Sequence, residues 1–270
     1  MNNYLHLICD YAVGDMAWAE VFSAMCSGLP PTVRMHMSSV ASFDTIATGF
    51  LVGQLGNAEE HLRPKDLLIF ANCAPRKDLK QARANNEGEG FLFCTLKNGV
   101  QVLAVNSGFS LSFVKNDISE LWSTVSEDTG SQFRSRDYFP QKVWAAVKED
   151  YSFLLHKLDI AATVPDPPKE AIGYIDSFGN LKTTIRSGTE FTDKLEPGSR
   201  LKIRIGGSIR TATVATGSFN VREGDLAFAP GSSGQERKYW ELFKRGGSAW
   251  HEFGDPPTGS TLHFEEADQA

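Results

Sequence analysis

The chain has 270 residues, of which 41% are hydrophobic and 22% are charged, and it carries a formal net charge of −6. This composition is normal for a globular protein and leaves room for one large domain or two smaller ones. The acidic balance disfavours a nucleic-acid partner, because a track for phosphates needs clustered Lys and Arg. No apolar run approaches the ~20 residues that span a bilayer, so we expect no membrane segment.

The cysteine and histidine residues predict neither disulfides nor a metal centre. The four cysteines lack Cys-x-x-Cys spacing and lie among apolar or small residues, which favours buried free thiols in a reducing cytosol. The six histidines show none of the spacings typical of metal ligands, so we expect no metal. The N-terminus lacks the basic start of a secretory signal and soon reaches Asp10. We therefore expect a cytoplasmic protein.

The first part of the chain, residues 1–163, predicts a mostly parallel α/β sandwich domain. Residues 5–9 form a short apolar run that ends at Asp10, as a buried parallel strand does. Residues 66–71 form the clearest strand and lead into Asn72. Further strands are expected at 32–37, 90–95 and 100–105, and helices at 16–27, 42–55 and 135–158. Ligands gather beyond the carboxyl ends of parallel strands, which places Asp10 and Asn72 near one crevice.

The last part of the chain predicts a smaller β domain. A proline-rich stretch, which we assign to residues 164–170, is typical of a stiff linker between domains. After it, within 171–270, strand-like alternation recurs at short spacing between Gly-rich turns. The clearest of these strands lie at 201–205, 209–214 and 225–228. The pattern indicates a small β-barrel or β-sandwich.

The segment from Tyr174 to Ile185 carries the most specific local signal. It predicts a strand, a tight turn at Phe178-Gly179-Asn180 and a second strand. A plain β-hairpin explains that pattern. The same turn, however, presents an acid (Asp176), an aromatic ring and an amide together, which suits a flat polar ligand such as a nucleoside.

Several further segments occur in a recognisable order along the chain. They are Cys9-Asp10-Tyr11 with Asp15, Phe43-Asp44 before a helix, Gln132 to Asp137, Tyr174 to Ile185, Phe219 to Gly224, and Gly231 to Gly234. With these segments in this order, the chain resembles the S-adenosylmethionine hydroxide adenosyltransferase family and its relatives, the S-adenosylmethionine-dependent fluorinases and chlorinases. The resemblance covers nearly the whole length of the chain, which is similar to a divergent member of the family.

The resemblance implies cleavage of S-adenosylmethionine by nucleophilic attack at C5′ of the ribose, with release of methionine and no further cofactor. The sulfonium is a good leaving group, so the protein mainly binds, aligns and desolvates the reactants. By resemblance, Asp10 would accept hydrogen bonds from the ribose hydroxyls and Phe43 would pack on the sugar. Phe178 would stack on the adenine, and the Asn180 amide would form hydrogen bonds with the edge of the base.

The resemblance also implies contacts to the methionine part of the ligand and an oligomeric site. Asp15, Asp176 and Ser232 would hold its ammonium and carboxylate, and Phe133 and Ser233 would complete the pocket. Members of the family bind the ligand between the first domain of one subunit and the second domain of its neighbour in a trimer. We therefore expect a homotrimer.

The family pattern breaks at the residues that generate the nucleophile. Hydroxide-forming members use an Asp, an Arg and a His, whereas this chain has Asn72 for the Asp and Arg134 for the His. Arg76 is near enough to replace the missing Arg. An amide cannot accept a proton, and a guanidinium stays charged, so neither Asn72 nor Arg134 can act as a general base. Nucleophile activation is therefore expected to be altered.

Three functions remain compatible with this pattern. The chain could use a nucleophile that needs no base, such as a halide, since Ser135 falls where the fluorinase has its halide-contacting serine. It could be a nucleoside-binding protein without turnover. It could also be a scaffold recruited for chemistry on an amine or amino acid, such as a Pictet–Spengler condensation. In that case Glu87 and Glu89 would be the acid–base groups, although the polar composition of 77–90 equally suits a solvated loop.

Overall fold

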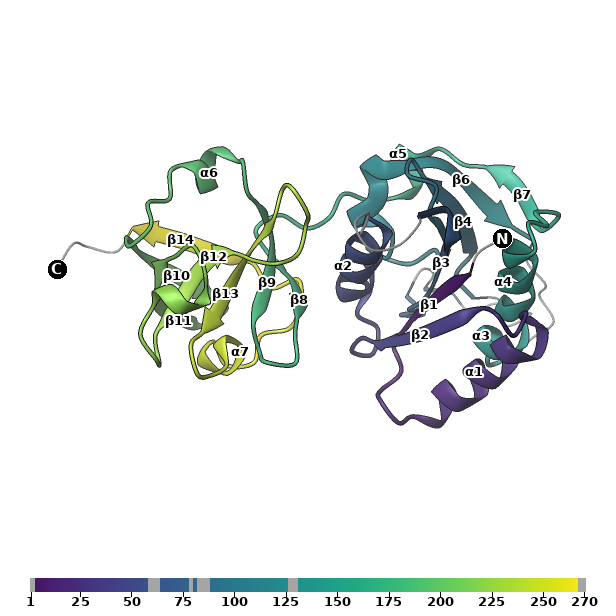
Figure 1. Cartoon of the computed structure of the whole chain (residues 1–270), viewed down its shortest axis with the longest axis horizontal. Helices are drawn as coiled ribbons and strands as arrows, with labels where there is room; N and C mark the ends of the chain where they lie inside the picture. The colour runs from purple at the N-terminus through teal and green to yellow at the C-terminus, as the bar shows by residue number, and fades with distance from the viewer. Residues whose placement is uncertain (1–2, 58–63, 78–79, 82–87, 126–130, 267–270) are drawn as a thin grey trace. The chain divides into compact units, whose positions relative to one another are not determined.

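The structure, a computed structural model, describes residues 3–57, 64–77, 80–81, 88–125 and 131–266. The chain divides into two compact units, Met1–Asp166 and Pro167–Ala270 (Figure 1). The division falls within the stretch 164–170 that the sequence assigns to a linker. The two units are mixed α/β and mainly β, which confirms the expected fold class.

The first unit is built on a seven-stranded sheet in the order β2-β1-β3-β5-β4-β6-β7. Its strands are β1 (Tyr4–Cys9), β2 (Arg34–Ser39), β3 (Leu67–Asn72), β4 (Phe91–Leu96), β5 (Gln101–Val105), β6 (Ile118–Thr124) and β7 (Leu154–Lys157). The pairs β1–β2, β1–β3 and β3–β5 are parallel, whereas β4 is antiparallel to β5 and β6. The parallel half of the sheet contains the strands that end at the candidate site.

Helices cover both faces of this sheet. They are α1 (Met16–Gly28), α2 (Thr45–Gly56), α3 (Arg134–Asp137), α4 (Phe139–Val147) and α5 (Ile160–Thr163), with the short 3-10 turns η1 (Pro64–Asp66) and η2 (Ser112–Asp117). In Figure 1, α2 lies on one side of the sheet and α1, α3 and α4 on the other. The carboxylates of Asp15 and Asp44 start α1 and α2, because each accepts a hydrogen bond from a first-turn N–H at 2.8 Å.

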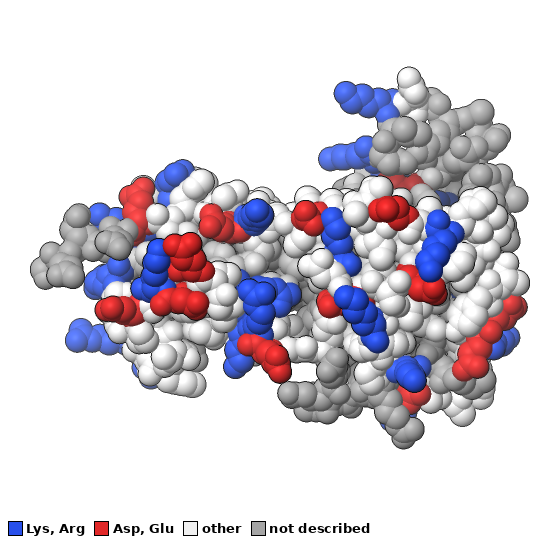
Figure 2. Space-filling model, turned by 90° about the horizontal axis from the view of Figure 1, so that it is seen from above, with Lys and Arg blue, Asp and Glu red and all other residues white. Residues whose placement is uncertain are grey.

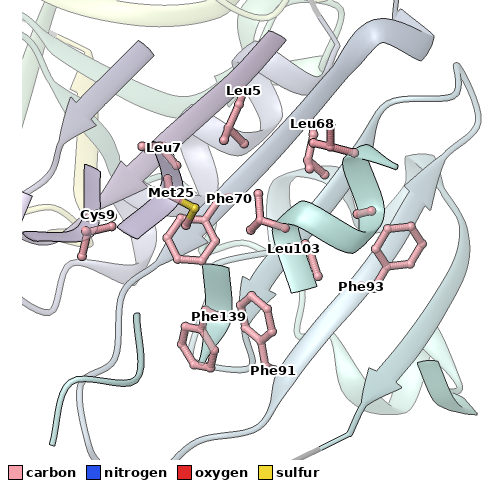
Figure 3. Close-up of a cluster of buried hydrophobic side chains, with 14 of the residues drawn as sticks. Leu5, Leu7, Cys9, Met25, Leu68, Phe70, Phe91, Phe93, Leu103 and Phe139 are labelled. Carbon is pink, nitrogen blue, oxygen red and sulfur yellow. The ribbon is translucent and has the colours of Figure 1, made fainter. Parts of the chain in front are cut away.

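One core of the first unit lies between the sheet and the α1/α3/α4 layer. Alternate residues of β1, among them Leu5 and Leu7, point into it together with Phe70 of β3. Figure 3 shows the rings of Phe91 and Phe139 side by side, and their centroids are 4.0 Å apart with an interplanar angle of 4°. Phe139 also lines the pocket described below, so core packing fixes one wall of the site.

The prediction of a single helix over residues 135–158 is wrong. The structure has two short helices there, α3 and α4, followed by strand β7. Tyr138, with φ −124°, separates the helices, and Pro140 fits the first turn of α4, where its missing N–H has no helical partner to lose. After α4, Glu149 takes a left-handed φ of +61°, which turns the chain toward β7 at the sheet edge.

The second unit contains a seven-stranded sheet in the order β14-β10-β11-β12-β13-β9-β8. Its strands are β8 (Ile172–Ile175), β9 (Leu181–Arg186), β10 (Arg200–Ile205), β11 (Ser208–Val214), β12 (Leu226–Pro230), β13 (Tyr239–Lys244) and β14 (Leu262–Glu266), with α6 (Glu190–Asp193), η3 (Ser218–Asn220) and α7 (Ala249–Glu252) between them. A bridge between Ala171 and Thr261 joins the two ends of the sheet. The sheet therefore curls back on itself around its own buried core, as expected for a small barrel.

Charged side chains of both signs are interspersed on the face displayed in Figure 2. Many charges pair at short range, such as Lys157 with Glu120 at 2.7 Å and Lys194 with Glu190 at 2.8 Å. Exposed pairs of this kind add little stability because water screens them, so the buried cores of the two units account for more of the stability. Within the described residues, no helix is both long and apolar enough to cross a bilayer.

Candidate functional site

A pocket of about 480 Å³ lies in the first unit, beyond the carboxyl ends of β1 and β3. Asp10 follows β1, Asn72 ends β3, and the Asp10 N–H donates to the Asn72 carbonyl at 3.2 Å. Parallel pairing of Cys9 with Asn72 thus brings both predicted side chains to one place. The pocket is lined by Asp10, Tyr11, Ser42, Phe43, Asn72, Ala74, Arg76, Gln81, Gly88, Glu89, Ser131, Gln132, Phe133, Arg134, Ser135 and Phe139.

Asp10 ties the loop before α2 to the pocket. Its carboxylate accepts a hydrogen bond from the Phe43 N–H at 3.0 Å. Phe43 has a left-handed φ of +66°, unusual for a non-glycine residue, and its side chain remains 53% exposed. Burial raises the pKa of Asp10 above its ordinary value, and backbone N–H groups partly offset that rise. The pocket thus presents a half-buried carboxylate beside an exposed ring.

A hydrogen-bonded chain of three side chains forms another part of the wall. Asn72 Nδ2 donates to Tyr11 Oη at 2.8 Å, and Tyr11 Oη lies 2.6 Å from Ser135 Oγ. The tyrosine ring packs edge-on against Trp18 and Phe133, with centroids 5.6 and 6.1 Å away. Burial raises the pKa of Tyr11 well above its ordinary value, so the phenol is protonated at neutral pH.

The third feature of the pocket is a carboxylate beside a guanidinium. Glu89 is 3% exposed, and its Oε1 accepts a hydrogen bond from the Arg76 N–H at 2.5 Å. Arg134 donates from Nη1 to the Glu89 carbonyl at 2.8 Å, and its Nη2 lies 3.7 Å from Glu89 Oε2. Arg134 also stacks on Phe139, 5.2 Å from the ring centroid. Of Glu89, Asn72 and Arg134, the residue whose side chain can accept a proton is therefore Glu89.

Glycine at position 88 makes this arrangement possible. A Cβ atom on Gly88 would lie 2.1 Å from Arg134 Nη2 and 2.3 Å from its Cζ. The loop therefore approaches the guanidinium closely only because this side chain is absent. Glu87, the other predicted acid–base residue, lies outside the described residues.

Several predicted ligand contacts lie outside this pocket. Asp15 is exposed, and its side chain caps α1. Asp176 closes its own turn, since one carboxylate oxygen accepts from the N–H groups of Phe178 and Asn180 at 3.0 Å each. Phe178 stands at the tip of that turn with 77% of its side chain exposed. Both interpretations of this turn fit its geometry, because it is a hairpin that also presents an exposed ring.

The remaining predicted contacts gather at a second pocket, of about 500 Å³, in the second unit. Asn180 and Ser232 line it, whereas Ser233 is buried and its carbonyl accepts from the Tyr239 N–H. Lys238, Lys244 and Arg245 also line this pocket. Each unit therefore carries its own group of predicted site residues.

The sequence did not predict that Tyr11 and Phe139 line the pocket. Tyr11 directly follows Asp10, so the position after the first strand carried a signal that could have been used. Phe139 had no such signal, because its place depends on how α4 begins. Within the described part of the chain, no three His, Cys, Asp or Glu side chains cluster in a way that could hold a metal ion.

Comparison with known proteins identifies the fold and leaves the activity open. No protein-family model and no curated protein sequence matches the chain. An uncharacterized conserved protein from Thermotoga maritima superposes with a TM-score of 0.73 at 15% identity, covering 97% of this chain and 100% of that one. A conserved hypothetical protein from Thermus thermophilus gives 0.69 at 14% identity, covering 98% and 100%. At these identities the likeness concerns the fold alone.

Proposed function

We propose that the chain is an S-adenosylmethionine-binding enzyme that transfers or hydrolyses the adenosyl group. The observation that carries the proposal is that residues implied by the family resemblance lie around one pocket. They are Asp10, Phe43, Asn72, Phe133 and Ser135. They come from separate stretches of sequence, and their convergence at the carboxyl ends of parallel strands is what a ligand site in this type of sheet needs.

In the proposed reaction a nucleophile forms a bond to C5′ of the ribose as the C5′–sulfur bond breaks. The bonding electron pair passes to sulfur, which converts the sulfonium into the neutral thioether of methionine. Asp10 would accept hydrogen bonds from the ribose hydroxyls, and the exposed ring of Phe43 would pack on the sugar. Much of the rate would come from alignment, since the leaving group needs no protonation.

Glu89 supplies the base that the family pattern lacks at Asn72. If water is the nucleophile, its oxygen bonds to C5′ and its proton passes to the Glu89 carboxylate. The Arg76 N–H and the Arg134 guanidinium hold that carboxylate in place. A halide nucleophile would need no such step, so dependence on Glu89 distinguishes the two reactions.

The proposal extends to assembly and compartment. A cytoplasmic homotrimer is proposed on the resemblance, with Asn180 and Ser232 of a neighbouring copy meeting the adenine and methionine parts of the ligand. The mass of the particle in solution, measured by light scattering with and without S-adenosylmethionine, tests this part separately. A monomer in both samples would contradict it.

A second candidate function is favoured by the presence of the buried carboxylate of Glu89 in a pocket that aromatic side chains also line. Tyr11, Phe133 and Phe139 line the same pocket and could hold an aromatic amine. In a Pictet–Spengler condensation the amine and an aldehyde take up one proton and form an iminium with release of water. A ring carbon then bonds to the iminium carbon, and its proton passes to a base. Glu89 could serve as that base.

Calorimetry with S-adenosylmethionine and with adenosine tests the first candidate. We expect binding, followed by formation of adenosine in water, or of halogenated adenosine with chloride or fluoride, detected by chromatography. Binding of neither compound at millimolar concentration would contradict the proposal. Binding without any product would identify a non-catalytic nucleoside-binding protein.

The variant Glu89→Gln tests the base in either reaction. We expect hydrolysis, or condensation of L-tryptophan with acetaldehyde, to fall by about 10²-fold or more, within the range that general base catalysis contributes. Glu120→Gln is the matched control, because Glu120 lies on β6 and pairs with Lys157 at the surface. Binding of the amino acid and not of the nucleoside would favour the second candidate.

A further inference from the structure

The chain of side chains Asn72, Tyr11 and Ser135 has a fixed hydrogen-bond direction. In the bond of 2.8 Å between Asn72 Nδ2 and Tyr11 Oη, the amide nitrogen can only donate, so the phenol oxygen accepts. The same phenol oxygen lies 2.6 Å from Ser135 Oγ. One of these two hydroxyls must donate to the other.

The surroundings of Tyr11 decide which hydroxyl donates. The ring is held edge-on by Trp18 and Phe133, and Trp18 Nε1 donates to the Tyr11 carbonyl at 3.2 Å. The phenol keeps its proton, and within the described residues Asn72 and Ser135 are the partners of its hydroxyl. The phenol oxygen already accepts from Asn72 and is a poor second acceptor, because its other lone pair is conjugated with the ring. The favoured arrangement therefore has the phenol donating its proton to Ser135 Oγ.

Ser135 therefore ends the chain with a proton of its own to donate. The residue is 4% exposed and lines the pocket. Within the part of the chain that the structure describes, its hydroxyl makes no hydrogen bond other than the one with Tyr11. A buried hydroxyl at a pocket wall is best satisfied by an acceptor on the ligand, because an unmade hydrogen bond costs about 1–3 kcal/mol.

We propose that Tyr11 determines the specificity of the pocket by making Ser135 a hydrogen-bond donor, so that the bound molecule carries an acceptor oxygen or an anion beside Ser135. The inference deepens the proposed function and rests on it for the identity of the whole ligand. The acceptor would belong either to the attacking nucleophile, which always carries lone pairs, or to a carboxylate of the substrate. Asn72 acts one step further away, as a positioning residue.

Asn72→Asp reverses the chain without changing its shape. A carboxylate at this position accepts from the phenol, the phenol oxygen then accepts from Ser135, and the pocket loses its donor. Formate is the probe for an acceptor, and its binding can be followed by NMR through the Asn72 side-chain amide signal in wild type and the Trp18 indole signal in every variant. We expect formate to bind the wild-type protein and its dissociation constant to rise about tenfold or more in Asn72→Asp, the effect of losing one hydrogen bond.

The added negative charge needs its own control. Gln132→Glu places one charge on the wall of the same pocket and lies outside the hydrogen-bonded chain. Its effect on formate should be that of charge alone, about two- to fivefold. A loss in Asn72→Asp no greater than the loss in Gln132→Glu would overturn the proposal, as would the absence of formate binding to the wild-type protein at high millimolar concentration.

A double-mutant cycle separates the role of Tyr11 from simple packing. Tyr11→Phe keeps the ring between Trp18 and Phe133 and removes the hydroxyl. In that background Asn72→Asp should lower formate affinity only as much as Gln132→Glu does, because the link to Ser135 is gone. Equal losses in both backgrounds would contradict the inference. If formate affinities follow the pattern expected for this cycle, the role of Tyr11 and Ser135 is supported even when S-adenosylmethionine does not bind. Failure of this inference can therefore be distinguished from failure of the proposed function.

The same probe locates the acceptor when S-adenosylmethionine does bind. Formate binding that persists in the complex assigns the acceptor to a separate nucleophile. Formate binding that the substrate abolishes assigns the acceptor to a group of the substrate itself. Both results support a donor at Ser135.

Discussion

The carboxylate of Asp10 accepts a hydrogen bond from the Phe43 N–H and is nevertheless partly removed from water. Burial raises its pKa, so the ionised form is less favourable in the folded protein than in the unfolded chain. The resulting loss of stability is absent below the ordinary carboxyl pKa. It grows as the pH rises through the raised value and is complete at neutral pH. A ligand with hydroxyl donors would offset it.

Replacement of Asp10 by Asn tests this balance between stability and binding. The amide oxygen can still accept from the Phe43 N–H, so we expect a melting temperature at pH 7 equal to or above that of the wild type. The difference should shrink as the pH falls toward the ordinary carboxyl pKa. Under the proposed function, binding of S-adenosylmethionine should weaken at the same time. A melting temperature several degrees lower at pH 7 would show that the carboxylate stabilises the fold, contrary to the direction of its pKa.

Gly88 and Gly90 form a natural pair for testing the carboxylate–guanidinium arrangement. Gly88→Ala would place a Cβ atom 2.1 Å from Arg134 Nη2, whereas on Gly90 the nearest atom is 3.9 Å away. Because the end of an arginine side chain can move, we expect Gly88→Ala to cost less than about 1 kcal/mol of stability. Under the proposed function, its catalytic activity should nevertheless fall about tenfold, because Arg134 is displaced from Glu89. Gly90→Ala should keep near wild-type activity, and equal losses in both variants would contradict this role of Arg134.

At the scale of elements, α2 packs so closely on the backbone at Phe109, just before η2, that position 49 has no room for a Cβ atom. A Cβ atom at Gly49 would lie 2.1 Å from the Phe109 carbonyl oxygen, which belongs to the backbone and cannot rotate away. We therefore expect Gly49→Ala to lower the free energy of unfolding of the first unit by about 1–3 kcal/mol, measured by urea denaturation. Gly90→Ala is the control in the same unit, because the nearest atom lies 3.9 Å from its Cβ position. Similar midpoints for both variants would mean that α2 shifts without cost.

Element patterns explain which parts of the fold could be predicted. The apolar run of residues 5–9, followed by a polar residue, identified β1 and the position of Asp10, because buried parallel strands carry that pattern. The segment 135–158 has core residues at helical spacing, so periodicity alone joined α3, α4 and β7 into one helix. The turn at Glu149 depends on a left-handed backbone that a glutamate rarely adopts, so its residue type gave no warning.

The candidate site shows the same limit. Asp10 and Asn72 could be placed together because strand pairing obeys simple rules. Burial of Glu89 could not be predicted, since polar composition describes a loop and says nothing of which residue turns inward. Its position depends on Arg76, Gly88 and Arg134, which act together only in the folded unit. Sites assembled by long-range packing are where local patterns carry least information.

At the scale of the whole molecule, the second unit has what an independent domain needs. Its sheet has a core of its own, and main-chain bonds near 171 and 261 join its two ends. The Ile172 N–H donates to the Ser260 carbonyl at 3.0 Å, and the Leu262 N–H donates to the Glu170 carbonyl at 2.7 Å. A curled sheet closed in this way exposes fewer unpaired strand edges, which favours a stable and monodisperse fragment.

We therefore expect residues 167–270, expressed alone, to fold and to unfold in a single cooperative transition followed by circular dichroism. A fragment that begins at residue 177 is the matched comparison. It lacks β8, which pairs with β9 and carries the buried Ile172 of the core, so we expect it to lose cooperative unfolding. If the longer fragment shows no cooperative unfolding transition, the second unit depends on the first for its stability. Equal stability of the two fragments would show that closure through β8 contributes nothing.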